Sequence, residues 1–167
     1  YRTDGVRASI SPSMDIQVSS NFERALFDAL GRDGAALQAL MDGLKQSGGF
    51  SIPAPALARL RADFDSGSCS EAETSATIAA ELGASGELLC PHSAVGVKVA
   101  GEHLGHTPMI TLATAHPAKF PAAVHAATGL HPALPPHLAD LFDRPERVTR
   151  AANDLDALKA LIRNRLG

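Results

Sequence analysis

The stretch that decides the fold class is Pro108-Met109-Ile110-Thr111-Leu112-Ala113-Thr114. It is apolar and partly β-branched, and turn-forming residues bound it, as expected for a strand buried on both faces of a parallel sheet. Ala115-His116-Pro117 follows at once, and its proline is placed to begin a helix whose apolar face carries Phe120, Val124 and Ala127. We therefore predict a strand–loop–helix unit of an α/β protein.

Four amphipathic helices are predicted before this unit, because apolar residues recur there at three- and four-residue spacing. Two of these helices fit Ser-x-x-Glu capping boxes, formed by Ser20 with Glu23 and by Ser70 with Glu73. In the third helix, Phe64 belongs to the predicted apolar face. The predicted ranges are about 20–31, 33–48, 53–64 and 70–82.

The remaining segments are shorter or less regular. Residues 1–18 are predicted to be a strand or an extended loop, because they show no helical period. A helix is predicted from Pro91 to about Leu104, because proline suits the first helical turn. Residues 147–150 fit a short strand, and the spacing of apolar residues predicts a final helix around 155–162.

Composition excludes several classes of protein. The 167 residues carry a net charge of −3, which excludes a basic protein that neutralises nucleic-acid phosphates. Hydrophobic residues make up 45% of the chain, enough for one ordinary core. No apolar run reaches the roughly 18 residues of a membrane span, and the two cysteines lack Cys-x-x-Cys partners. We expect a soluble, cytoplasmic chain with reduced thiols, and no nucleic-acid or membrane partner.

The chain begins at Tyr1 and not at a methionine. From this we expect residues 1–167 to be a single region of a longer polypeptide whose upstream part is missing.

A ligand site is predicted around Thr114 and His116. In open α/β sheets, ligands gather at the carboxyl ends of parallel strands, where helix N-termini point their amides. The Thr114 hydroxyl is placed to contact a heteroaromatic nitrogen there. The alternative is purely structural, with Thr114 as a strand-end residue and His116 as a helix cap.

Two other candidate sites are weaker. His103 and His106 are the closest histidine pair, but Gly105 and Pro108 break the helix that would hold both imidazoles on one side, so we predict a surface turn and no metal site. Cys90 lies at a helix N-terminus, where a thiol gains reactivity, although a small buried cysteine is the commoner case.

Four phrases resemble the C-terminal part of threonine synthase, of the type found in many bacteria and fungi. The resemblance runs in order over nearly the whole chain and is weakest at residues 32–70 and after residue 130. The four phrases are Ser11-Pro12-Ser13-Met14-Asp15-Ile16, Ser19-Ser20-Asn21-Phe22-Glu23-Arg24, Pro91-His92-Ser93-Ala94-Val95-Gly96 and Leu112-Ala113-Thr114-Ala115-His116-Pro117-Ala118-Lys119-Phe120.

The resemblance implies the C-terminal, helix-rich part of the large α/β domain of a fold-type II pyridoxal-phosphate enzyme, similar to the β subunit of tryptophan synthase. It implies a carbon–oxygen lyase acting on phosphate, which converts O-phospho-L-homoserine and water to L-threonine and phosphate. The Schiff-base lysine of this family lies upstream and is not Lys119, so we expect residues 1–167 alone to be inactive. The full-length form is expected to be a monomer.

The same resemblance assigns site residues. Thr114, Ala115 and His116 are expected to bind the cofactor, and Asn21 and Arg24 to reach toward substrate, although a solvated helix end is an equal alternative for the last two. No catalytic or metal-binding residue is assigned within this chain.

One position departs from the family pattern, which usually has an aspartate where Cys90 stands. A thiol is a poorer acceptor than a carboxylate, so any catalytic contribution of that aspartate is in doubt here. Ser93 stands for the usual threonine and keeps its hydroxyl.

Two rival functions stay open. One is a sister fold-type II pyridoxal-phosphate lyase that acts on a different amino acid. The other is a non-catalytic helical module that binds a partner through the apolar stripes of its first half.

Overall fold

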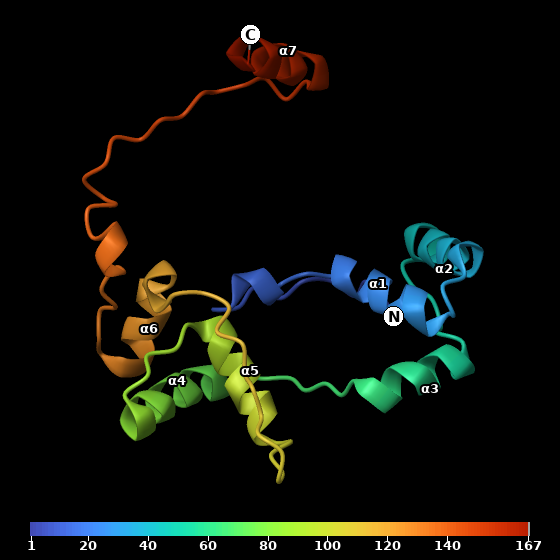
Figure 1. Cartoon of the computed structure of the whole chain (residues 1–167), viewed down its shortest axis with the longest axis horizontal. Coiled ribbons are helices and arrows are strands. Elements are labelled where there is room, and N and C mark those ends of the chain that lie inside the picture. The colour runs from blue at the N-terminus through green and yellow to red at the C-terminus, as the bar shows by residue number, and fades with distance from the viewer. Residues whose placement is uncertain (167) are drawn as a thin grey trace. The chain divides into compact units, whose positions relative to one another are not determined.

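The computed structural model describes residues 1–166, which form two compact units, one from Tyr1 to Ala133 and one that begins at Leu134 (Figure 1). The first unit contains η1 (Pro12–Met14), α1 (Ser20–Ala29), α2 (Gly34–Ser47), α3 (Ala54–Asp63), α4 (Glu71–Ser85), α5 (Pro91–Gly101), η2 (Pro117–Lys119) and α6 (Pro121–Thr128), where η marks a 3₁₀ turn. The second unit contains η3 (Pro136–Leu138) and α7 (Leu155–Leu166).

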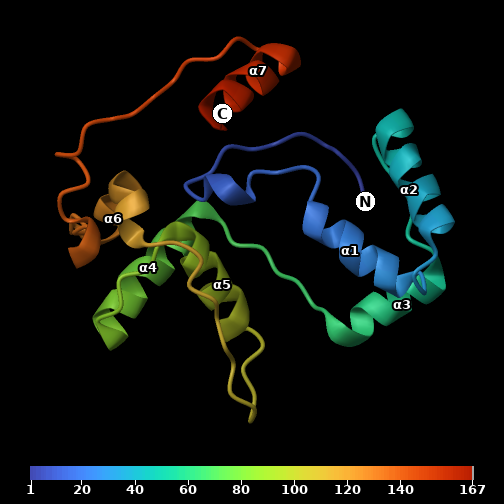
Figure 2. The same cartoon turned by 45° about the horizontal axis from the view of Figure 1, so that its top comes forward.

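Helices α1, α2 and α3 pack together (Figure 2). Their shared core consists of small and medium apolar side chains, namely Leu26, Ala29, Leu44 and Ala56. The Arg59 guanidinium donates to the Ala29 carbonyl at 2.7 Å and so satisfies one of the free carbonyls at the end of α1. Phe64 directly follows α3 and is 65% exposed, so its predicted place on the apolar face of this helix is wrong.

Helix α4 packs against both α5 and α6, and this packing positions the candidate site (Figures 1 and 2). The core of this group is fully buried and contains Ile78 from α4, Ala94 from α5 and Val124 from α6. The three residues come from three different helices, and α4 is the helix that packs against both of the others.

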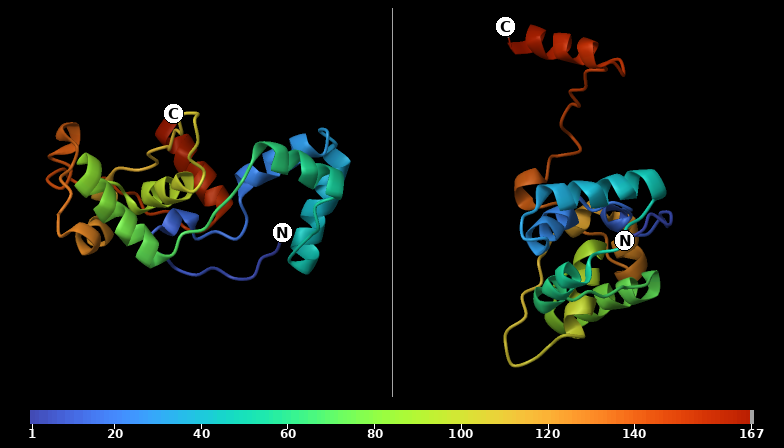
Figure 3. Two further views of the ribbon diagram at one scale, coloured as in Figure 1. Left: turned by 90° about the horizontal axis from the view of Figure 1, so that it is seen from below. Right: turned by 90° about the vertical axis from the view of Figure 1, so that its right-hand side faces the viewer.

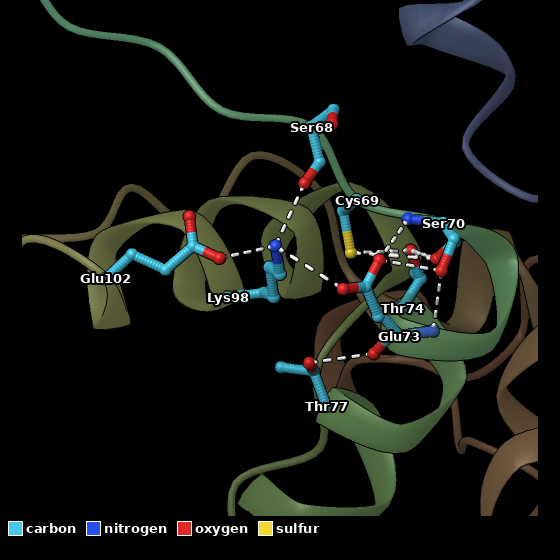
Figure 4. Close-up of polar contacts among 8 residues, drawn as sticks. All are labelled: Ser68, Cys69, Ser70, Glu73, Thr74, Thr77, Lys98 and Glu102. Carbon is cyan, nitrogen blue, oxygen red and sulfur yellow. Dashed lines mark hydrogen bonds and ion pairs between the residues drawn. The ribbon is translucent and has the colours of Figure 1, made fainter.

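A polar cluster adds to the α4–α5 contact (Figure 4). The Lys98 ammonium on α5 lies 2.6 Å from Glu102 Oε1 and 3.5 Å from Glu73 Oε1 on α4, and it donates to the Ser68 carbonyl at 3.0 Å. Hydrogen bonds from Ser70, with the nearby Lys98 charge, lower the pKa of Glu73, and the bond to Glu102 raises the pKa of Lys98. Both groups therefore stay charged near neutral pH.

The predicted capping box at α4 is confirmed. Ser70 Oγ accepts the Glu73 amide at 3.3 Å, and the Ser70 amide donates to Glu73 Oε2 at 2.7 Å. The capping box predicted at Ser20 is wrong. Ser20 is the first residue of α1, and Ser19 occupies the N-cap without a capping bond from its side chain. The preceding backbone decides which serine becomes the cap, and the Ser-x-x-Glu pattern alone does not show this.

The two serines give a matched test of the cap. Ser70→Ala is expected to destabilise the full-length protein by about 1 kcal/mol, because it removes the acceptor for the Glu73 amide. Ser20→Ala removes no capping bond and is expected to cost less than about 0.5 kcal/mol. Urea unfolding of both variants measures the difference, and equal costs would contradict the assignment.

The strand predicted at residues 108–114 is not formed in the part of the chain that the structure describes. These residues are extended but belong to no β-ladder, and Ile110 and Leu112 are 82% and 75% exposed. A strand needs neighbours that bond its amides and carbonyls, and residues 1–166 provide no adjacent strand. The prediction of a buried strand is therefore wrong for this chain taken alone.

In the second unit, an extended connection leads into α7 (Figure 3). The short strand predicted at residues 147–150 is wrong, because this stretch makes no β pairing within the described residues. The Arg165 guanidinium donates to Thr149 Oγ1 at 2.8 Å. Among residues 1–166, no helix has both the length and the apolar character needed to cross a membrane.

Candidate functional site

The candidate site is a cavity of about 260 Å³ between the start of α5 and the residues that precede η2. Two short stretches of the first unit form most of its wall. They contribute Cys90, Ser93, Ala113, Ala115, His116 and Pro117. Several of these side chains are small and do not fill the space beside residues 113–115.

The start of α5 is set by Cys90 and Pro91. Pro91 occupies the first helical turn, where its missing amide hydrogen costs nothing. Cys90 is the N-cap, and its Sγ accepts the Ser93 amide at 3.4 Å. Cys90 is also buried, so it resembles an ordinary core cysteine more than an accessible reactive thiol. The Cys90 thiol thus fills the capping role at the start of α5.

The buried Ser93 hydroxyl joins the two sides of the cavity. Its Oγ accepts the Thr114 amide at 3.2 Å and lies 3.2 Å from Cys90 Sγ. This contact brings the end of the predicted strand to the first turn of α5. Sequence reasoning noted the Ser93 hydroxyl but assigned it no partner.

Of the three residues expected to bind the cofactor, two line this cavity, and Thr114 lies next to it in the chain. Ala115 and His116 line it, and Thr114 lies between Ala113 and Ala115 with an exposed side chain. His116 Nδ1 accepts the Ala118 amide at 3.2 Å, so the ring caps η2 and its Nε2 carries the hydrogen when neutral. The alternative role of His116 as a helix cap is therefore observed, and it leaves Nε2–H available as a donor.

Asn21 and Arg24, the residues expected to reach substrate, lie elsewhere. Both are exposed on the first two turns of α1, and the Arg24 guanidinium donates to the Asn21 side-chain oxygen. Neither residue lines the cavity beside Ser93, and Arg24 borders a separate hollow with Phe27 and Leu37. The described residues do not bring these two side chains to the cofactor residues.

His92 is a buried residue to which sequence reasoning gave no role. Its Nε2 accepts the Ser13 amide at 3.0 Å, and its ring packs against Phe120 at a centroid distance of 4.6 Å. Its Nδ1 is buried and has no hydrogen-bond partner among the described residues. His92 thus ties η1 to α5 next to the cavity wall. The sequence signal was its place in the phrase Pro91-His92-Ser93, one of those that carry the family resemblance.

His92 makes the stability of the protein depend on pH. Burial is the main cause that lowers the pKa of His92, the Lys119 charge adds to it, and Asp15 opposes it. The folded state therefore binds this proton more weakly than the unfolded chain does. The stabilisation is complete above the ordinary histidine pKa of about 6.5 and is lost as the pH falls below it.

We expect the thermal unfolding temperature of the full-length protein to fall as the pH is lowered from about 7.5 to about 5. The proton taken up by His92 can change the free energy of unfolding by at most about 1.4 kcal/mol per pH unit. His92→Gln keeps an acceptor for the Ser13 amide but does not titrate, so it should flatten this fall. The exposed His137 offers a control, and His137→Gln should leave the slope unchanged. The same slope in both variants would refute the assignment to His92.

The chain is similar in sequence to the C-terminal part of known threonine synthases. A family model described as "Threonine synthase, C-terminal" matches residues 93–162. Threonine synthase from Pseudomonas aeruginosa is 50% identical over 165 residues, which cover 97% of this chain and 35% of the relative. The enzyme from Corynebacterium glutamicum is 40% identical, covering 91% of this chain and 33% of the relative.

A solved structure agrees with these matches. The crystal structure of PLP-bound threonine synthase from Brucella melitensis superposes with a TM-score of 0.90 at 53% identity, covering 98% of this chain and 36% of the other. The resemblance to the C-terminal part of threonine synthase is confirmed. The chain spans about one third of the length of the curated threonine synthases that it matches.

The predicted fold class is likewise confirmed, since the chain has the fold of the C-terminal part of threonine synthase, an enzyme of fold type II, and is rich in helix. A threonine synthase structure from yeast superposes with a TM-score of 0.78 at 32% identity, covering 99% of this chain and 38% of that chain. Residues 108–114 pair with no strand within residues 1–166.

The remaining histidines do not form a metal centre in the described part of the chain. His103 Nδ1 lies 3.6 Å from Asp65 Oδ2, and both His103 and His106 are exposed after the end of α5. Among residues 1–166, no three His, Cys, Asp or Glu side chains are grouped so that they would hold a metal ion.

Proposed function

We propose that this chain is the C-terminal part of a threonine synthase, a pyridoxal-phosphate lyase that converts O-phospho-L-homoserine and water to L-threonine and phosphate. The observation that carries the proposal is the cavity beside Thr114, formed in a chain that is 50% identical to a curated threonine synthase. The matching structure from Brucella melitensis is described as PLP-bound.

The residues around the cavity fit a flat heteroaromatic ring with one nitrogen to be contacted. Ala113 and Ala115 leave room for the ring, and the exposed Thr114 hydroxyl can donate a neutral hydrogen bond to the ring nitrogen. The Nε2–H of His116 adds a second donor at the wall. When bound, pyridoxal phosphate supplies an electron sink for carbanion chemistry.

A neutral hydroxyl and a carboxylate would act differently on that nitrogen. A carboxylate favours the protonated nitrogen, whereas the Thr114 hydroxyl holds the ring in place without adding charge. The role that we propose for Thr114 is therefore to orient the ring and to limit its charge. Ala115 shapes the wall beside it, and no residue of this chain is proposed as the anchoring lysine.

For substrate, we propose Asn21 and Arg24. A guanidinium and an amide are suited to the anionic oxygens of a phosphate ester or carboxylate. The present bond from Arg24 to Asn21 holds the two side chains together on the exposed face of α1, so they can act as one polar patch. Binding would recruit the remaining guanidinium donors.

The wider setting is proposed on the same basis. We propose that residues 1–167 form one region of the pyridoxal-phosphate domain, in a monomeric, cytoplasmic enzyme whose anchoring lysine lies outside this chain.

The test is to supply the full-length protein with pyridoxal phosphate and O-phosphohomoserine. We expect inorganic phosphate and threonine to be released in equal amounts. A protein that binds the cofactor but acts only on another amino acid would be a sister lyase. A protein that binds no cofactor, and instead captures a partner through its helices, would be the non-catalytic module. Either result would overturn the proposal.

A further inference from the structure

A buried hydroxyl contacts the backbone of the residue that we expect to face the cofactor. Ser93 is 3% exposed, and its Oγ accepts the Thr114 amide at 3.2 Å. We propose that Ser93 is a positioning residue, which fixes the backbone at Thr114, between the lining residues Ala113 and Ala115, and so sets the direction of the Thr114 hydroxyl beside the cavity. This role rests on the proposed cofactor function and deepens it, because it concerns how the chain orients the Thr114 hydroxyl, the proposed donor to the cofactor.

The hydrogen-bonding capacity of Ser93 explains why its hydroxyl is fixed. A serine hydroxyl has one hydrogen to donate and can accept two bonds. The Thr114 amide uses one acceptor position, and Cys90 Sγ lies 3.2 Å from the same oxygen. The Ser93 amide in turn donates to that sulfur at 3.4 Å. Ser93 is therefore bound to Cys90 through both backbone and side chain, and its hydroxyl is not free to rotate.

The face of α5 that carries Ser93 also guides the segment that ends at Thr114. A Cβ atom added at Gly96 would lie 3.1 Å from Thr111 Cγ2, so the segment passes very close to the helix at that point. Ser93 and Gly96 are three residues apart and lie on the same side of the helix. Thr111 and Thr114 are also three residues apart. The segment therefore runs along this face of α5 in the direction opposite to that of the helix.

Of these two contacts, the one at Ser93 is directional. Packing at Gly96 limits how close the segment lies but not how its backbone is rotated. A hydrogen bond fixes both the distance and the direction of the Thr114 amide. In the part of the chain that the structure describes, residues 108–113 make no backbone hydrogen bonds. The orientation of Thr114 therefore depends on Ser93.

The experiment is a double-mutant cycle on the affinity of the full-length protein for pyridoxal phosphate, measured by titrating the cofactor into the apoprotein. Ser93→Ala is expected to weaken binding about 5- to 10-fold, the effect of one hydrogen bond. In a Thr114→Val background the same change should weaken binding no further, because the donor that Ser93 positions is absent. A purely structural role would weaken binding equally in both backgrounds.

A second pair of variants removes any dependence on how well Ser93→Ala folds. Ser93→Thr and Ser93→Val have nearly the same shape and differ in the hydroxyl alone. We expect the threonine variant to bind the cofactor like the unchanged protein and the valine variant to bind it about 5- to 10-fold more weakly. Equal affinities in this pair, or an additive cycle, would overturn the positioning role.

The two proposals fail in different ways. If the unchanged protein binds pyridoxal phosphate but releases no phosphate from O-phosphohomoserine, the proposed function fails, while a non-additive cycle still supports the role of Ser93. If phosphate is released and the cycle is additive, only the positioning role fails.

Discussion

Replacing Thr114 with valine in the full-length protein is expected to slow phosphate release from O-phosphohomoserine about 100-fold, the scale of losing one preorganised donor. Valine keeps the β-branched shape and removes the hydroxyl that we assign to the ring nitrogen. The Thr114 side chain is exposed beside the cavity, so its packing contribution is small. Steady-state kcat/KM measures the effect, with the thermal midpoint recorded on the same samples.

Two variants control this prediction. Thr114→Ser keeps the hydroxyl and is expected to keep most of the rate. Thr111→Val removes a hydroxyl three residues earlier, where the threonine methyl group lies against Gly96, and it should leave the rate nearly unchanged. If Thr111→Val slowed the reaction as much as Thr114→Val, the loss would reflect damage to the segment and not loss of a cofactor contact.

The helices were predictable because their end signals are local. Asp33 accepts the amides of Ala35 and Ala36, and Gly48 ends α2 in the left-handed region with φ of 72°. Both signals are visible in the sequence as an N-cap residue and a Gly-Gly stop. Ser20 shows the limit of such signals, because the four-residue pattern Ser-x-x-Glu does not reveal the backbone conformation that precedes a helix.

Part of the site was predictable for a different reason. Thr114 and His116 were predicted from the rule that ligands bind where strands end and helices begin. The roles of Ser93 and His92 were not, because their partners are distant in sequence. Ser93 accepts an amide 21 residues away, and His92 accepts that of Ser13, 79 residues away. No periodicity or motif encodes such pairings, which arise only when α5 is packed against α4 and η1.

Amide hydrogens at residues 109–113 are expected to exchange at least about 100-fold more slowly in the full-length protein than in residues 1–167 produced alone. In this chain, Ile110 and Leu112 are exposed and the segment makes no backbone hydrogen bonds with the described residues. Its apolar, β-branched sequence suits a position inside a sheet, so the remainder of a complete enzyme should cover it. Hydrogen exchange with mass spectrometry measures the difference.

The same pair of samples separates folding from assembly. Amides of α4, whose Ile78 is fully buried by α5 and α6, should be protected in both. Residues 104–107 are exposed and should exchange rapidly in both. Residues 1–167 alone should release no phosphate. Rapid exchange at 109–113 in the full-length protein would mean that nothing covers the segment. Thr114 would then not lie at the end of a strand within a sheet. Its hydroxyl would lack the rigid support that a cofactor contact needs.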